Sequence, residues 1–373
     1  MPSLIETGLE LHSKEKISKG KVLLTGGSGF IASHVLDYLL DYGFEVVVTV
    51  RTEDKGRTIV KTLKDPSHPC SFVVVKDIAK EGAYNELFEA TSDSGGEEKP
   101  FDFVVHTASP YQLQVEDPVK DFLDPAIKGT TGLLHSILTH APSVRRVVIT
   151  SSSAAVINPK NHSKVYDETY WAPVTWEDAM DPKSTYRCSK VFSEKAAWAI
   201  ANATDPKPNF DLVTLNPTYN FGPIQRGLPR LASVNASNAR VRDLVLGVNG
   251  PHGSAPGLPP TAPVFTFVDV RDVALAHLRA LTVPEAGGHR FYLVGAHFSN
   301  QHIAATIARH FPELRDRLPI DMGEEHDDLP DDTYDFNVAK SRRVLGIEYR
   351  GLEESVVDTV RSILAHEDAQ GLP

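Results

Sequence analysis

The sequence has few cysteines, no long apolar run and no excess of basic residues, and each deficit excludes a class of protein. Two cysteines in 373 residues, Cys70 and Cys188, are too few for a disulfide framework and have no partners at metal-ligand spacing. Apolar runs such as residues 46–48 are far shorter than the roughly 20 residues that span a bilayer as a helix. The first twenty residues contain acidic side chains and no apolar stretch typical of a signal peptide. We therefore expect a cytoplasmic protein with reduced thiols and neither a bound metal nor a membrane anchor.

The formal net charge of −11 argues against partners that bind basic surfaces. Nucleic acids and anionic membranes attract proteins through clustered lysine and arginine, so neither is expected as a partner. The length is sufficient for two lobes with a sizeable core. A small-molecule ligand is the expected partner.

From Gly20 onward, short runs rich in β-branched residues alternate with helical patterns. Strands are predicted at 21–25, 45–50, 72–75, 101–106, 145–150 and 210–215, and helices near 30–42, 82–90, 118–140 and 184–203. Near-continuous apolar strands separated by helices are typical of a parallel sheet covered on both faces. The predicted fold class is therefore α/β, a Rossmann-type doubly wound sheet. Such sheets bind their ligands at the carboxyl ends of the strands.

The regular alternation ends near residue 216. Seven prolines and six glycines lie between residues 222 and 263, around one short helical pattern. Further on, a strand feeding a helix is predicted across 265–281, a strand at 289–295, and amphipathic helices at 300–311 and 352–366. The acidic run at 323–332 is interpreted as a solvated loop. We therefore expect a smaller, irregular C-terminal lobe.

A glycine motif follows the first predicted strand. Gly26, Gly29 and Ala32 form a G-x-x-G-x-x-A spacing that opens the first helix. Glycines allow a tight turn and a close approach to a pyrophosphate, and the helix amino terminus offers free N–H groups to it. A purely structural turn is the alternative, but the strand before and the helix after favour a dinucleotide site. The predicted cofactor contacts here are Gly26, Ser28, Gly29, Phe30 and Ile31.

The residues after the second strand favour NADP over NAD. An NAD site usually has an acidic residue about 20 residues beyond the glycines, where it binds the ribose 2′-hydroxyl. This sequence has Arg51 at the strand end, with Lys55 and Arg57 close behind. A guanidinium can form paired hydrogen bonds with a 2′-phosphate. Glu53 and Asp54 leave a solvated loop of mixed charge as the alternative.

The ends of the third and fourth strands supply further candidates. Asp77, with Ile78 beside it, is placed to reach the adenine. Thr107, Ala108 and Ser109 end the fourth strand and are expected beneath the nicotinamide half of the cofactor.

Tyr186 lies four residues before Lys190 within a predicted helix, so both side chains share one face. A free tyrosine has a pKa of about 10 and exchanges protons poorly at neutral pH. A nearby cation lowers that pKa toward the range where acid-base catalysis is efficient. Taken alone, the spacing is common on helices, and a half-buried tyrosine beside a surface lysine is the plainer interpretation.

Hydroxyl groups after the fifth strand favour the catalytic interpretation. Thr150, Ser151, Ser152 and Ser153 lie at the carboxyl edge of the sheet, where a nicotinamide would bind. Serines also form turns. The glycine turn, these hydroxyls and the Tyr-Lys pair occur together, in the order that a dinucleotide-dependent catalytic site on this fold requires.

These motifs resemble the extended short-chain dehydrogenase/reductase superfamily, the proteins similar to NAD-dependent epimerases and dehydratases. Within it, the chain is similar to the branch of dihydroflavonol reductases, cinnamoyl-CoA reductases and yeast and fungal aldehyde-ketone (methylglyoxal-type) reductases. The resemblance runs from about residue 21 to the final helix. The stretches that carry it are VLLTGGSGFIASHV, VVVTVR, KDIAKEGAYNELF, VVHTASP, PAIKGTTGLL, SVRRVVITSSSAAV, VYDETYW, YRCSK with EKAAW, LNPTYNFGP and FVDVRDVALAHL.

The resemblance implies roles for individual residues. Tyr186 and Lys190 match the catalytic pair of the family, and Ser152 matches the serine that faces the substrate, with Ser153 as the alternative. Pro217 and Thr218 match the segment whose backbone holds the nicotinamide carboxamide.

Two departures from the family stand out. Gly132 occupies a helix position where many short-chain enzymes have an asparagine, which leaves a proton relay through that residue in doubt. The motif that follows Tyr-Asp-Glu in plant cinnamoyl-CoA reductases is also missing, which disfavours a CoA thioester substrate.

The sequence thus predicts an NADPH-dependent reductase of aldehydes or ketones, a monomer or homodimer, with Tyr219 and Phe221 as apolar substrate contacts. We expect an N-terminal extension (1–19), an NADP-binding domain (20–217, to which 264–295 returns) and a mainly substrate-binding lobe with C-terminal helices (218–373). Two alternatives stay open: an NAD-dependent sugar-nucleotide epimerase or dehydratase, and a non-catalytic dinucleotide sensor. Arg51 disfavours the first, and the Tyr186–Lys190 pair disfavours the second.

Overall fold

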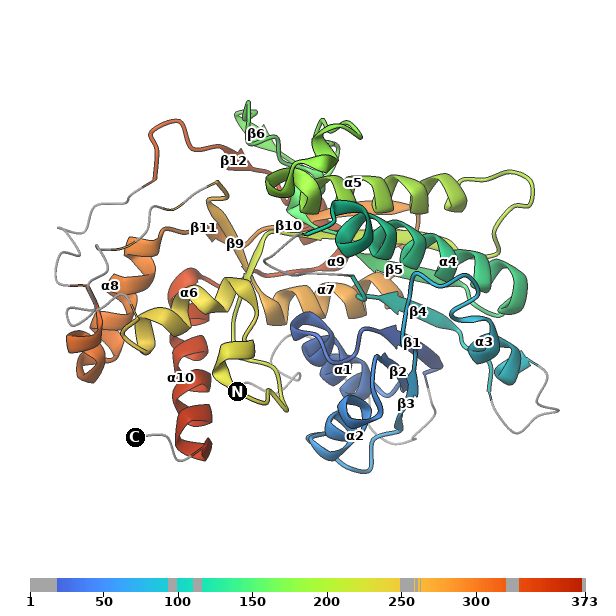
Figure 1. The fold of residues 1–373 in the computed structure, drawn as a ribbon, viewed down its shortest axis with the longest axis horizontal. Coiled ribbons are helices and arrows are strands. Elements are labelled where there is room, and N and C mark those ends of the chain that lie inside the picture. Colours follow the sequence, from blue (N-terminus) through green and yellow to red (C-terminus); the bar gives the residue numbers. More distant parts are fainter. Residues whose placement is uncertain are drawn as a thin grey trace.

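The computed structural model describes residues 19–92, 99–109, 116–248, 258, 261, 263–319 and 329–370. Almost all of the predicted N-terminal extension, and the acidic run up to residue 328, lie outside the described residues. In Figure 1 the parallel-sheet domain lies on the right, and a smaller lobe built around α6, α8 and α10 lies on the left.

The larger domain contains a seven-stranded sheet in the order β10-β7-β5-β4-β1-β2-β3, and every pairing in it is parallel. The strands are β1 (Lys21–Thr25), β2 (Glu45–Val50), β3 (Cys70–Val74), β4 (Phe103–His106), β5 (Arg146–Thr150), β7 (Asp211–Pro217) and β10 (His289–Leu293). Their side chains are largely buried, as expected for strands covered on both faces. The predicted Rossmann-type fold is confirmed.

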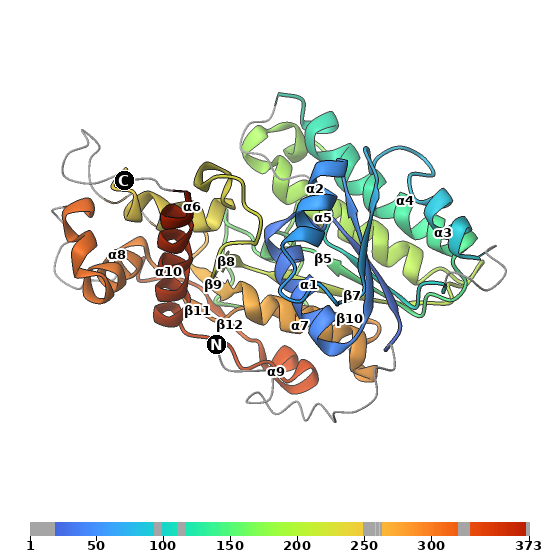
Figure 2. The same cartoon turned by 90° about the horizontal axis from the view of Figure 1, so that it is seen from below.

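Helices cover both faces of this sheet (Figure 2). One face packs against α1 (Phe30–Tyr42) and α7 (Val270–Thr282), which also contact each other, and α9 (Ala339–Leu345) adds Leu345 to the same core. The other face packs against α3 (Asn85–Ser92), α4 (Asp124–His140) and α5 (Pro182–Ala201). A π-helical turn at Val119–Leu123 leads into α4, within the range predicted as one helix.

Helix α2 (Glu53–Lys61) is absent from the sequence prediction, which expected cofactor contacts in this charged stretch and gave a solvated loop as the alternative. Only one residue of α2, Gly56, is buried, so the apolar pattern of a packed helix is weak. The helix contacts β3, where Gly56 faces the ring of Phe72.

The smaller lobe has its own core. A three-stranded sheet of β11 (Ala296–His297), β9 (Thr266–Asp269) and β8 (Tyr219–Phe221) contacts α6 (Ala236–Val245), α8 (Asn300–His310) and α10 (Leu352–Gln370). Strands β6 (Val165–Tyr166) and β12 (Asp335–Phe336) form a separate parallel pair. Strand β10 pairs with β7, so residues 289–293 belong to the large sheet.

The packing of α2 leads to a stability prediction. A Cβ at Gly56 would overlap the ring of Phe72. Apart from the backbone of its own helix, no atom of the described residues lies within 4 Å of a Cβ at Gly132 of α4. We expect Gly56→Ala to lower the free energy of unfolding by about 1–3 kcal/mol, because overpacking outweighs the better helix propensity of alanine. The control Gly132→Ala should raise it by about 0.5–1 kcal/mol. Urea denaturation of both variants measures the difference; a Gly56→Ala variant more stable than the parent would contradict this packing.

Candidate active site

The glycine turn between β1 and α1 leaves no room for a side chain. Gly26 has a φ of 71°, and a Cβ there would lie 2.9 Å from the Cα and N of Ala108, at the end of β4. The Gly29 N–H donates to the Gly26 carbonyl over 2.9 Å and closes the turn. No side chain caps the first turn of α1, which also contains no acidic residue. This bare turn and uncapped helix start fit the pyrophosphate of a dinucleotide.

Hydrogen bonds between strand ends fix the segment opposite the glycine turn. The Thr107 hydroxyl donates to the Thr25 carbonyl over 2.6 Å, and the Ala108 N–H donates to Thr25 Oγ1 over 3.2 Å. His106 Nδ1 lies 2.8 Å from Thr25 Oγ1, and its Nε2 lies 3.3 Å from Thr130 Oγ1. Burial lowers the pKa of His106 to about 3, and the charge of Lys190 acts in the same direction. His106 is therefore a neutral link between β1, β4 and α4.

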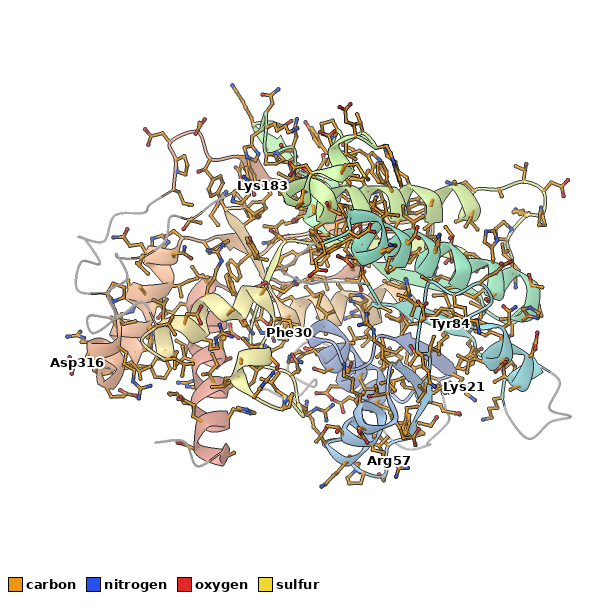
Figure 3. The ribbon with its side chains drawn as sticks, viewed as in Figure 1. Lys21, Phe30, Arg57, Tyr84, Lys183 and Asp316 are labelled. Atoms are coloured by element: carbon orange, nitrogen blue, oxygen red, sulfur yellow. The ribbon has the colours of Figure 1, made fainter. Side chains whose placement is uncertain are left out.

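Basic side chains gather after β2, as predicted. Arg51 follows the strand directly and is exposed, and Lys55 is exposed on the first turns of α2. Arg57 is also exposed, but it forms an ion pair with Glu53 one turn earlier, at 3.2 Å. Figure 3 shows Arg57 on α2 at the outer side of the sheet, with Phe30 at the start of α1. Arg51 and Lys55 are thus the better candidates for a 2′-phosphate.

The two candidates after β3 differ in exposure. Asp77 is exposed, and its carboxylate accepts the Ala79 N–H over 2.9 Å. Ile78 is buried and packs against Gly129 of α4, where a Cβ would lie 2.9 Å from Ile78 Cδ1.

Tyr186 and Lys190 lie on one face of α5. The helix begins with Pro182, and the carboxylate of Asp181 caps it by accepting the Lys183 N–H over 3.0 Å. Lys190 Nζ lies 5.9 Å from the centre of the Tyr186 ring, and the edge of that ring faces Phe122. Burial lowers the pKa of Lys190 to about 8, and the carboxylate of Glu194 opposes that shift.

The hydroxyl residues after β5 have different environments. Ser151 is buried and donates to Glu194 Oε2 over 2.6 Å. Ser152 is half-buried, and its Oγ accepts the Ala154 N–H over 3.1 Å, which caps a short 3-10 turn. Ser153 is buried within that turn. Thr150 Oγ1 lies 2.7 Å from His277 Nε2 on α7.

A small pocket lies where the ends of β4 and β5 meet α4 and α5. It brings together four of the predicted site residues, Ala108, Ser109, Thr150 and Lys190. Its remaining lining residues are His106, Thr130, Ile149, Ser151, Ser193 and Glu194.

The candidates at and after the end of β7 are largely buried. Thr218 donates its hydroxyl to the Thr266 carbonyl over 2.7 Å, and Pro217 is paired with Leu293 of β10. Tyr219 is half-buried beneath the guanidinium of Arg240. Phe221 is fully buried and packs against Phe267 and Phe298. The ring of Phe221 therefore belongs to the core of the smaller lobe and offers no surface to a substrate, which corrects its prediction as a substrate contact.

Glu194 and Arg290 are two of the site residues that had no predicted role. Their side chains pair at 2.7 Å, and Glu194 is 1% exposed. Glu194 lies eight residues after Tyr186 and four after Lys190, so the helical spacing that singled out the pair could have extended to it.

Within the described part of the chain, no helix has the length and apolar character needed to cross a bilayer. The same residues contain no group of three or more His, Cys, Asp or Glu side chains arranged to hold a metal ion.

Comparison with known proteins identifies the family. The model of the NAD dependent epimerase/dehydratase family matches residues 22–295, and the chain belongs to this family. Its resemblance to extended short-chain dehydrogenases/reductases is thereby confirmed.

Individual relatives cover almost the whole chain. Ketoreductase azaE of Aspergillus niger is 53% identical over 92% of this chain and 97% of its own length. The NADPH-dependent methylglyoxal reductase GRE2 of Saccharomyces cerevisiae is 34% identical over 93% of this chain and 98% of its own. The crystal structure of yeast methylglyoxal/isovaleraldehyde reductase Gre2 complexed with NADPH matches with a TM-score of 0.84 and 32% identity, over 93% of this chain and 99% of that one.

The position of Arg51 leads to a prediction of cofactor selectivity. Because a charge-assisted hydrogen bond contributes about 1.5–3 kcal/mol, Arg51→Asp should weaken NADPH binding about 10- to 100-fold and spare or improve NADH binding. Arg57→Asp is the matched control, since Arg57 already pairs with Glu53, and it should change the NADPH/NADH ratio little. Fluorescence titration of both cofactors measures the ratio. Equal affinity of the parent for NADPH and NADH would refute the assignment.

Proposed function

We propose that the protein is an NADPH-dependent reductase that converts aldehydes or ketones of modest size to alcohols. The observation that carries the proposal is the position of Tyr186 and the buried Lys190 on one face of α5, where Lys190 shares a pocket with the ends of β4 and β5. The relatives named as a ketoreductase and as an NADPH-dependent methylglyoxal reductase support the same class of reaction.

The residues of the carboxyl edge fit NADP(H). We infer that the glycine turn, with Gly26, Ser28, Gly29, Phe30 and Ile31, holds the pyrophosphate, because it opens α1 and leaves the start of that helix without a capping side chain. Contacts to the remaining parts of the cofactor are assigned to Arg51, Lys55, Asp77, Ile78, Thr107, Ala108, Ser109, Thr150, Pro217 and Thr218. When bound, NADPH supplies the hydride that reduces the carbonyl carbon.

The chain's own residues handle the oxygen and the proton. Ser152 donates a hydrogen bond to the carbonyl oxygen, and Tyr186 donates its phenolic proton to that oxygen as negative charge develops. The Lys190 ammonium lowers the pKa of the phenol and donates hydrogen bonds to the ribose hydroxyls. The hydroxyls of Ser152 and Tyr186 are thus preorganised to stabilise the negative charge that develops on the carbonyl oxygen.

The smaller lobe is proposed to bind the rest of the substrate. We assign residues 20–217 and 264–295 to the cofactor-binding domain and most of 218–373 to the substrate lobe, with Tyr219 as a contact at their junction. A monomer or homodimer in the cytoplasm remains the prediction.

The observations favour reduction over the alternatives. A sugar-nucleotide epimerase would use NAD, and the exposed Arg51 disfavours that cofactor. The structure of a UDP-glucose 4-epimerase from Thermotoga maritima matches at 19% identity and a TM-score of 0.67, a likeness of fold alone. A non-catalytic sensor does not require the Tyr186–Lys190 pair.

Removing one oxygen atom tests the proton donor. Because a positioned acid typically contributes about 10²–10⁴ in rate, Tyr186→Phe should lose that factor in kcat and keep its affinity for NADPH. Tyr170→Phe is the control, since Tyr170 is 38% exposed, packs against Tyr166 and should tolerate the same change. Steady-state reduction rates and NADPH fluorescence measure the two effects; a Tyr186→Phe variant within a few-fold of the parent would refute the role.

The three serines after β5 provide a register test. Ser152→Ala should cost about 10²–10³ in kcat, because it removes a donor aimed at a developing oxyanion. Ser151→Ala and Ser153→Ala should cost less, since Ser151 is engaged with Glu194 and Ser153 is buried. Measuring kcat for all three decides the register, and Ser153→Ala as the slowest variant would move the substrate contact by one residue.

A further inference from the structure

A buried carboxylate joins four elements at the carboxyl edge of the sheet. Glu194 of α5 accepts hydrogen bonds from Ser151 Oγ at 2.6 Å, beyond β5, and from Thr214 Oγ1 at 2.7 Å and Asn216 Nδ2 at 2.8 Å, both on β7. Arg290 of β10 donates to it through Nε at 2.7 Å. Each of these donors favours the ionised form of the carboxylate.

The partner of Glu194 is itself held in place. Arg290 also donates through Nη1 to the Glu168 carbonyl at 2.6 Å and to the Tyr170 carbonyl at 2.8 Å, and it stacks 3.6 Å above the centre of the Trp171 ring. Burial alone would raise the pKa of Glu194, but the charge of Arg290 and the hydrogen bonds from its neighbours outweigh burial and lower it. Glu194 is therefore a fixed negative charge.

This charge lies beside the catalytic candidates. Glu194 follows Lys190 by one helical turn, and both line the same small pocket. Burial lowers the pKa of Lys190 and Glu194 raises it, so the carboxylate favours the ammonium form. Asn216 Nδ2 also donates to the carbonyl of Ser152 at 3.2 Å, which connects Glu194 to the proposed substrate contact.

The other groups facing Lys190 cannot replace this charge. On α5, Tyr186 lies one turn before Lys190, whereas Glu194 lies one turn after it, and Ser193 is uncharged. From β4, His106 is neutral because burial lowers its pKa to about 3. Thr130 of α4 and Ser151 are uncharged, and Arg290 faces Glu194 rather than Lys190. Among the described residues lining this pocket, Glu194 is the acidic one.

We propose that Glu194 is a positioning residue of the reductase: it holds Lys190 as an ammonium beside Tyr186 and fixes the ends of β5 and β7 that present Ser152 and Pro217. This inference rests on the proposed function, because it assigns Glu194 a role through Lys190 and Ser152. Glu194 contacts neither substrate nor cofactor in this role.

The proposal predicts that Glu194→Gln imitates the loss of Lys190. Without the carboxylate the pKa of Lys190 falls, so the ammonium is lost at a lower pH. Tyr186 then lacks its neighbouring cation and its pKa rises. Since alcohol oxidation requires the phenolate, the rising limb of its pH profile should move to more alkaline pH, by about one unit. The dissociation constant of NADPH should also rise, because a neutral lysine binds the ribose less well. Lys190→Met should produce both changes.

A double-mutant cycle separates this role from a structural one. Glu194→Gln is made in the parent and in the Lys190→Met background, and NADPH binding by fluorescence and the oxidation profile are measured in each. If Glu194 acts through Lys190, the substitution shifts both readouts in the parent and adds nothing in the Lys190→Met background. Equal effects in the two backgrounds, or no effect in the parent, would overturn the proposal.

Two further variants control for folding. Asp211→Asn weakens the Arg146–Asp211 pair, which joins the same strands β5 and β7 at their opposite ends, and it should leave the pH profile unmoved. Glu194→Gln combined with Arg290→Gln removes both charges of the buried pair, so that Arg290 is not left without its carboxylate. This double variant should shift the profile in the same direction as Glu194→Gln alone, and an unmoved profile in it would also overturn the proposal.

The outcomes distinguish this inference from the proposed function. If Tyr186→Phe and Lys190→Met both behave like the parent, the proposed function fails. If both lose function as expected while Glu194→Gln retains the parent's profile and affinity, only the role of Glu194 fails.

Discussion

The parallel sheet constrains where this protein can do chemistry. Its strands are largely buried on both faces, so polar side chains gather mainly toward one edge of the sheet. At the carboxyl edge, hydrogen bonds tie Thr25 of β1 to His106 of β4 and to Ala108 beyond it. Glu194 of α5 binds Ser151 beyond β5 and residues of β7 and β10. The glycine turn and the Tyr186–Lys190 face of α5 both depend on this fixed edge, because each packs directly against it.

The buried ion pair of Glu194 and Arg290 at that edge has a role beyond stability. Burying a carboxylate and a guanidinium costs desolvation energy, and a buried pair often contributes less stability than apolar residues of the same volume. The Glu194–Arg290 pair is therefore not explained by stability alone. Its position one helical turn from Lys190 offers an electrostatic role, since Lys190 is buried and would otherwise lose its proton more readily. Polar networks of this kind rigidify a site when every member is satisfied.

Much of this arrangement could be predicted from the sequence, and the remainder depends on contacts that sequence patterns do not display. Continuous apolar strands predicted the sheet, and the spacing of Gly26, Gly29 and Ala32 predicted the turn. Helix α2 was missed because its packing rests on Gly56, which lacks an apolar side chain. Glu194 was missed because its partners lie on strands up to 96 residues away along the chain. Phe221 follows the site segment in sequence, yet the separate core of the smaller lobe encloses it.

Tracing the hydride from NADPH to the product tests the proposed carbonyl reduction most directly. The protein would be incubated with NADPH that carries deuterium at both C4 positions of the nicotinamide and with a panel of small aldehydes and ketones, and the products would be analysed by mass spectrometry and NMR. Carbonyl reduction by this site predicts one deuterium on the carbinol carbon of the alcohol for each NADPH consumed. NADH with the same label should give little turnover. Alcohol without deuterium at that carbon, or no alcohol from any carbonyl despite tight NADPH binding, would contradict it.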